Sequence, residues 1–259
     1  MPKPQVIILR APGTNCDRET AFAFERAGAR TELVHVNRLL ENPDELRRFQ
    51  VLCIPGGFSY GDDVAAGRIL AMRLNHHLAE QIFQFRDDDK LILGICNGFQ
   101  TLMKAGVLAP GPAATLTWND SGRFEDRWVA LRTAGTKCVF LRGIDRMELP
   151  VAHAEGKFVP RDRQALHQMT SDGELVLKYD HDTRAADGEP DGEVPYPANP
   201  NGSVSAVAGV CDATGRVFGL MPHPERNLDP THHPRWTRRE ADSAADGLPV
   251  FLNAVSYFD

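Results

Sequence analysis

The sequence lacks the features that mark secreted, membrane-spanning and nucleic-acid-binding proteins. No apolar run approaches the ~18 residues of a membrane span, and no signal-like segment precedes the first apolar run, residues 6–9. The formal net charge is −6, so the chain has no overall basic character with which to bind nucleic acid or an anionic membrane. We therefore expect a cytoplasmic protein with neither kind of partner.

Cysteine is sparse and shows no metal-site spacing. The five cysteines stand at positions 16, 53, 96, 138 and 211, without a CxxC pair or a compact cysteine and histidine cluster. A GxxxxGK[ST] loop for nucleotide phosphates is also missing. The simplest interpretation is a set of free thiols in a reducing compartment, with no metal, no ATP site and no cofactor in this chain.

What is present is an alternation of short apolar runs with helical patterns. Apolar runs at 6–9, 51–54 and 91–95 and an alternating strand at 31–36 are separated by helical patterns such as 18–27. This order predicts a parallel sheet covered on both faces. We interpret residues 1–259 as a single α/β domain because no linker or repeat divides them.

The later part of the chain is less regular. Strand-like pieces at 128–132 and 137–140 predict an antiparallel extension, and 205–210 with 217–221 form a predicted hairpin. The segment 182–203 is rich in glycine and proline and is predicted to be a loop. Its acidic half, 182–193, is most simply a solvated surface segment.

One stretch indicates a nucleophile. The apolar run 91–95 ends at Cys96, which lies between Gly94 and Gly98 and is followed by a helical pattern. A sharp strand-to-helix turn would place this thiol at a helix N-terminus, where the helix dipole favours the thiolate. A buried cysteine in an ordinary strand-to-helix join explains this stretch alone equally well.

Two further loops should meet the Cys96 turn at the carboxyl edge of the sheet. These are residues 10–17 and 55–62, each of which follows an apolar strand. The pair Gly56-Gly57 lets a backbone N–H approach a ligand closely, as an oxyanion hole requires. A plain tight turn is the alternative interpretation.

A histidine and a carboxylate follow the last apolar strand. In Pro222-His223-Pro224-Glu225 the prolines are expected to keep the backbone extended, so that His223 and Glu225 point the same way. A cysteine nucleophile needs a base and a group that orients that base, and Cys96, His223 and Glu225 supply these three parts. By chemistry alone, such a segment at a strand end is more often a turn or a surface pair than part of a triad.

Together these motifs resemble the class I (triad) glutamine amidotransferases. The resemblance rests on residues 94–100 and 221–226, and residues 12–17, 55–62 and 152–156 narrow it toward glutaminase subunits of purine biosynthesis. Residues 199–203 fit the same pattern. The five principal motifs run in the same order from residue 12 to residue 226. The resemblance implies a flavodoxin-like three-layer fold with a mostly parallel sheet and an antiparallel extension.

The resemblance also implies roles for particular residues. Cys96 would be the nucleophile, His223 the general base and acid, and Glu225 its orienting partner. Gly57 and the backbone N–H of Asn97 would form the oxyanion hole. Gln100 is a further candidate for binding the substrate, and Asn15 a candidate for support or for the subunit interface.

The implied reaction is hydrolysis of L-glutamine to glutamate and ammonia. The ammonia would pass to a separate large synthetase subunit, joined by a small bridging subunit, and the synthetase would convert formylglycinamide ribonucleotide to formylglycinamidine ribonucleotide. ATP and magnesium would belong to that partner. Loops 10–17, 55–62 and 152–158 are the expected docking face.

The sequence departs from the expected pattern at a few places. Phe99 replaces a small residue or cysteine, and Ala154 replaces a glycine in the segment Ala152-His153-Ala154-Glu155-Gly156. His153 and Glu155, two apart, would leave one face of an extended strand and are candidates for support of the site or for the interface. A satisfied structural pair is the alternative. The pairs His76-His77 and His232-His233 are expected to be solvated.

Rival functions fit parts of this pattern. One is an amidotransferase of another pathway or a γ-glutamyl hydrolase. Another is a redox or stress protein with a cysteine elbow, which would not require His223 and Glu225. A third is a subunit that only binds and regulates its partner, and the complete set of cysteine, histidine and glutamate argues against it.

Overall fold

The computed structural model describes residues 3–109, 113–181, 193–238 and 245–259. Its strands form a nine-stranded sheet in the order β2-β1-β3-β4-β11-β10-β9-β6-β7 and a second, two-stranded sheet of β5 and β8. The strands are β1 Gln5–Arg10, β2 Arg30–His35, β3 Val51–Ile54, β4 Leu91–Ile95, β5 Ala114–Thr117, β6 Glu125–Thr133, β7 Arg146–His153, β8 Lys157–Pro160, β9 Leu177–Asp180, β10 Val207–Cys211 and β11 Val217–Leu220.

The large sheet has two halves that differ in strand direction. From β2 through β1, β3 and β4 to β11 every neighbouring pair is parallel. From β11 through β10, β9 and β6 to β7 every pair is antiparallel. We call these the parallel half (β2, β1, β3, β4 and β11) and the antiparallel half (β10, β9, β6 and β7). The predicted α/β fold with an antiparallel extension is confirmed.

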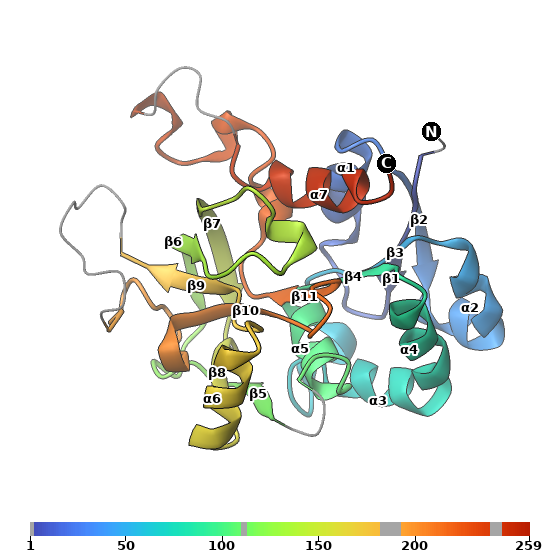
Figure 1. Ribbon diagram of the computed structural model, residues 1–259, viewed down its shortest axis with the longest axis horizontal. Coiled ribbons are helices and arrows are strands. Elements are labelled where there is room, and N and C mark those ends of the chain that lie inside the picture. Colours follow the sequence, from blue (N-terminus) through green and yellow to red (C-terminus); the bar gives the residue numbers. More distant parts are fainter. Residues whose placement is uncertain (1–2, 110–112, 182–192, 239–244) are drawn as a thin grey trace.

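Helices cover both faces of the parallel half (Figure 1). The helices are α1 Asp17–Arg26, α2 Val36–Glu41, α3 Arg68–His77, α4 Ala79–Asp87, α5 Asn97–Lys104, α6 Arg163–Ser171 and α7 Leu248–Ser256. In Figure 1, α1 and α7 lie together on one side of the sheet, while α3, α4 and α5 lie on the other. Strands β3, β4 and β11 are apolar throughout, because a strand buried on both faces has no solvent side.

Some predicted elements differ from the structure. Residues 137–140 do not form a strand; Cys138 precedes a short 3-10 helix, Val139–Leu141, because the chain turns back there toward β7. The predicted helix at 43–46 is also of the 3-10 type, Pro43–Arg48. The hairpin is confirmed, since β10 and β11 are antiparallel neighbours. The acidic segment 182–192 lies outside the described residues.

No helix in the described ranges is long and apolar enough to cross a membrane.

Candidate active site

Cys96 lies on a strained turn between β4 and α5. Its backbone has φ 51° and ψ −104°, and a positive φ is unfavourable for a residue with a Cβ. The Cys96 N–H donates to the Leu220 carbonyl of β11 at 2.8 Å, which fixes the turn at the carboxyl end of the parallel strands. A Cβ on Gly98 would lie 1.8 Å from the Ile54 carbonyl oxygen, so only glycine lets α5 pack this closely on the sheet. The predicted cysteine elbow is present.

His223 and Glu225 form a buried pair beyond the end of β11. His223 Nδ1 lies 2.6 Å from Glu225 Oε1, and both side chains are almost fully buried. The expectation of an extended backbone through Glu225 is wrong, because Pro224–Arg226 form a 3-10 turn after an extended His223. The tight turn nevertheless brings the two side chains together.

Charge around the imidazole favours its protonated form. Burial alone lowers the pKa of His223, but the charges of Glu225 and of an ionised Cys96 outweigh burial and hold that pKa well above its ordinary value. His223 Nε2 is buried and bonds to no acceptor in the described chain. Because His223 and Cys96 line the same cavity, the arrangement suits a thiolate that attacks and an imidazolium that gives its proton to a leaving amine.

The predicted oxyanion donors are backbone groups close to Cys96. Gly57 has φ +144°, and a Cβ there would lie 2.8 Å from the Gly13 carbonyl oxygen and from the Asn15 nitrogen. Among the described residues, no acceptor is bonded to the N–H of Gly57 or to that of Asn97. Both groups are therefore available to a ligand, as an oxyanion hole requires.

The side chains of Asn97 and Gln100 hold in place the helix α5 that follows Cys96, which we call the elbow helix. Asn97 donates to Asp62 Oδ1 at 2.9 Å and accepts from the Ser59 N–H at 3.2 Å. Gln100 donates to the Glu155 carbonyl, accepts from Asn97 and is 3 % exposed. The structure therefore places Gln100, a candidate for substrate binding, in a network beneath the elbow and outside the lining of the cavity.

His153 is buried at the end of β7 and stays neutral. Burial, aided by the charge of His223, lowers the pKa of His153 to about 3. Asn119 Oδ1 accepts from the Gly156 N–H, so the neutral imidazole donates from Nδ1 to the same oxygen at 3.1 Å. Asn119 Nδ2 in turn donates to the His153 carbonyl at 2.8 Å. His153 therefore supports the loop 154–156.

Glu155 ties this loop to the elbow helix. It follows the end of β7, so it does not share a strand face with His153 as expected. Glu155 Oε2 lies 3.5 Å from Lys104 Nζ of α5, and Glu155 Oε1 accepts from the Ala66 N–H. Burial lowers the pKa of Lys104, and the charge of Glu155 opposes that effect. This buried pair joins the loop after β7 to the parallel half.

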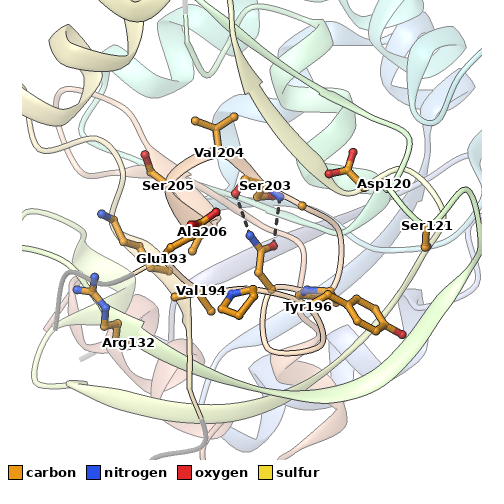
Figure 2. A pocket seen from close by; sticks show the side chains of 15 residues that line it. Asp120, Ser121, Arg132, Glu193, Val194, Tyr196, Ser203, Val204, Ser205 and Ala206 are labelled. Atoms are coloured by element: carbon orange, nitrogen blue, oxygen red, sulfur yellow. Dashed lines mark hydrogen bonds between the residues drawn. The ribbon is translucent and has the colours of Figure 1, made fainter. Parts of the chain in front are cut away.

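The segment 199–203 supports the same loop from the other side. Asn201 Nδ2 donates to the Gly156 carbonyl at 2.8 Å, and Ser203 Oγ accepts from the Phe158 N–H at 2.9 Å. Figure 2 shows Ser203 in two hydrogen bonds with an asparagine, which is Asn199. The residues drawn there line a cavity of about 650 Å³ that includes none of the predicted triad.

The cavity at the elbow is smaller, about 220 Å³. Besides Cys96, His223, Gly57 and the predicted Asn15, it is lined by Cys16, Phe58, Phe124, Asp126, Ala152 and Arg226. Cys16, Phe58 and Arg226 lie in loops or motifs that the sequence already places near the site. Phe124, Asp126 and Ala152 come from the antiparallel half and the segment before it. Their pattern is that of an ordinary strand and its turn, so only their position relative to Cys96 could have identified them.

A metal does not suit this site. Among the described residues, one group of ligand-type side chains lies close enough together to hold an ion, namely Cys16, His223 and Glu225. Two ligands each about 2.0 Å from a tetrahedral ion stand more than 3 Å apart. The 2.6 Å between His223 Nδ1 and Glu225 Oε1 is the length of a charge-assisted hydrogen bond instead.

The expectation that His232 and His233 are both solvated is confirmed for His232 and wrong for His233. His233 is fully buried, lies 3.3 Å from Glu148 and packs edge-on against Trp128. A histidine next to a proline gave no sign of this burial, because the partners come from strands far away in the sequence.

Comparison with known proteins agrees with this geometry. A family described as the CobB/CobQ-like glutamine amidotransferase domain matches residues 3–258, and the chain belongs to this family.

Two relatives and one solved structure are similar to nearly the whole chain. The chain is 47 % identical over 263 residues to the phosphoribosylformylglycinamidine synthase subunit PurQ of Dehalococcoides mccartyi, covering 99 % of this chain and 98 % of the relative. It is 37 % identical over 273 residues to PurQ of Methanococcus maripaludis, with the same coverage. A solved structure described as PurLQS from Thermotoga maritima matches with a TM-score of 0.75 at 30 % identity, and covers 100 % of both chains.

Proposed function

We propose that this chain is the glutaminase subunit of a phosphoribosylformylglycinamidine synthase in purine biosynthesis. The proposal rests on one observation above all: the strained Cys96 shares a cavity with a histidine whose Nδ1 is held 2.6 Å from a buried carboxylate. The full-length similarity to PurQ proteins specifies which amidotransferase this is.

The reaction begins at the side-chain amide of L-glutamine. The Cys96 thiolate attacks the amide carbon, and the oxyanion that develops receives hydrogen bonds from the N–H groups of Gly57 and Asn97. His223, protonated and held by Glu225, gives its proton to the leaving nitrogen, so that ammonia departs and a γ-glutamyl thioester remains.

His223 then serves as a base for the second half of the reaction. It takes a proton from water, which attacks the thioester and releases glutamate and the thiolate. Glu225 keeps the Nδ1–H directed away from the sulfur throughout, so that Nε2 faces the reacting groups.

The ammonia is consumed by a separate ATP-dependent synthetase subunit. The similarity to a structure described as PurLQS supports such an assembly. Phe58 and Phe124 are about half exposed beside the cavity, with ring centroids 6.4 Å apart, and we propose that they belong to the docking face. A small bridging subunit is part of the same proposal.

The test is a Cys96→Ala variant assembled with the synthetase subunits. Glutamine-dependent synthesis should fall by at least about 10³-fold, because the nucleophile is lost. Synthesis from added ammonium should be unchanged, since the partner's site is intact. The control, Cys138→Ala, removes a buried thiol far from the cavity and should keep both activities. Glutaminase activity that survives in Cys96→Ala rules out this nucleophile.

A further inference from the structure

The cavity beside Cys96 carries charged groups that the reaction at the amide does not use. Asp126 lines one wall, and Arg226 with Asn15 lines another. A cavity of about 220 Å³ is below the ~300–1,000 Å³ of typical small-molecule pockets, so it suits a ligand with few heavy atoms. These groups are therefore placed to recognise a small charged molecule.

One wall of the cavity, which we call the donor wall, consists of Asn15 and Arg226 and surrounds the thiol of Cys16. Arg226 Nη2 lies 3.2 Å from Cys16 Sγ, and Cys16 Sγ donates to Asn15 Oδ1 at 3.2 Å. These contacts bring the guanidinium and the Asn15 side chain together. Arg226 Nε also donates to Glu19 at 3.1 Å, which fixes the plane of the guanidinium. The Asn15 amide nitrogen donates to no described residue, so this wall offers unused donors beside a positive charge.

The other wall, which carries the Asp126 carboxylate and which we call the acceptor wall, belongs to the antiparallel half. Asp126 in β6 pairs with Ala152 in β7, and the Ala152 carbonyl oxygen lies 3.6 Å from Cys96 Sγ. The Asp126 carboxylate is exposed, and it makes neither a hydrogen bond nor an ion pair with any residue in the described part of the chain. Arg226 pairs with Glu19, and no ion pair joins Arg226 to Asp126 among the described residues.

Given the proposed glutaminase function, on which this inference rests, we propose that Asp126 and Arg226 select the head group of L-glutamine. The Asp126 carboxylate accepts from the α-ammonium group, while Arg226 and the Asn15 amide donate to the α-carboxylate. Phe58 and Phe124 flank the methylene groups. The two residues determine specificity and take no part in bond breaking.

The test compares covalent reagents that label Cys96 in the assembled complex. L-2-amino-4-oxo-5-chloropentanoate carries both head-group charges, 5-chloro-4-oxopentanoate lacks only the ammonium, and 2-chloroacetamide lacks both. Each forms a bond from Cys96 Sγ to the chlorinated carbon as chloride leaves. The labelling rate is measured by mass spectrometry at reagent concentrations far below saturation.

The expected pattern separates the two residues. Asp126→Asn should slow labelling by the amino reagent about 10–100-fold and leave the other two reagents unchanged, because only that reagent has an ammonium group. Arg226→Gln should slow both carboxylate-bearing reagents and leave 2-chloroacetamide unchanged. The control, Asp120→Asn, removes an exposed carboxylate outside this cavity and should change none of the rates.

Other patterns overturn the inference. If the wild type reacts equally with the amino reagent and with 5-chloro-4-oxopentanoate, the ammonium is not recognised. If Asp126→Asn slows all three reagents alike, or slows none, Asp126 is not a specificity residue. A complex that is labelled at Cys96 but releases no glutamate from glutamine contradicts the proposed function, whatever the labelling pattern.

Discussion

The two halves of the large sheet contribute differently to the site. The parallel half carries the groups that we propose react, since Cys96 and His223 follow the adjacent strands β4 and β11. The antiparallel half and the loop after it contribute Asp126, Ala152 and the supports His153 and Glu155. Parallel strands place their carboxyl ends at one edge of the sheet, so that the loops after different strands meet there. The antiparallel half supplies further residues that line the cavity.

The largest expected effect concerns the chemistry at the end of the parallel half. Glu225→Gln should lower kcat for glutamine hydrolysis by the complex about 10²–10⁴-fold, because the neutral amide no longer stabilises the imidazolium of His223. Ammonium-dependent synthesis should be preserved. Glu41→Gln, an exposed carboxylate at the end of α2, is the matched control. A kcat within threefold of the wild type would show that Glu225 does not assist His223.

The second prediction concerns packing in the parallel half. Gly98→Ala should destabilise the fold by about 3 kcal/mol, because the new Cβ would lie 1.8 Å from the Ile54 carbonyl oxygen and α5 must move off the sheet. Urea unfolding measures this change.

The matched substitution lies beside the antiparallel half. Gly143 has φ +70° with no atom within 4 Å of an added Cβ, so Gly143→Ala should cost only about 1 kcal/mol of backbone strain. Equal losses for the two variants would mean that the elbow helix tolerates displacement.

The third prediction concerns the Lys104–Glu155 ion pair, which connects the two halves. Lys104→Met leaves the buried Glu155 without its counter-charge and should lower the free energy of unfolding by roughly 2–3 kcal/mol. Lys157→Met breaks the more exposed pair with Asp120 and should cost less than about 1 kcal/mol. The double variant Lys104→Met, Glu155→Gln should recover part of the loss. Urea unfolding of the three variants shows whether the Lys104–Glu155 pair stabilises the contact between the two halves.

The smallest effect appears as a pH dependence in the antiparallel half. His153 has a folded pKa of about 3, while an unfolded histidine titrates near 6.5, so protons bind preferentially to the unfolded chain below pH 6.5. This residue should therefore cost roughly 2 kcal/mol of stability as the pH falls from 7 to 5. His223, whose folded pKa is raised, loses its contribution in the opposite direction, as the pH rises.

Comparing variants isolates the titration of His153. His153→Asn should flatten the dependence of the unfolding free energy on pH between 7 and 5, since asparagine does not titrate. His167→Asn, on the exposed face of α6, should leave the dependence as in the wild type. If both variants keep the wild-type slope, His153 is not the group responsible.

The sequence by itself determined the parallel half and the loops that carry the candidate reacting groups. Fully apolar runs of four or five residues followed by glycine-rich turns identify buried parallel strands and their loops. These signals are local, because each depends on a strand and the turn directly after it. The roles of Cys96, Gly57, His223 and Glu225 in those loops were implied by the resemblance to the glutamine amidotransferases.

Only the tertiary structure decided how the site is closed and supported. Asp126 and Phe124 come from a segment whose local pattern is ordinary, and the burial of His233 depends on Glu148 and Trp128 in distant strands. Antiparallel pairing and side-chain contacts between remote segments leave no periodic trace in the sequence. The candidate reacting groups therefore lie in segments with a recognisable local pattern, whereas the residues proposed to recognise the substrate could be found only by knowing which walls face Cys96.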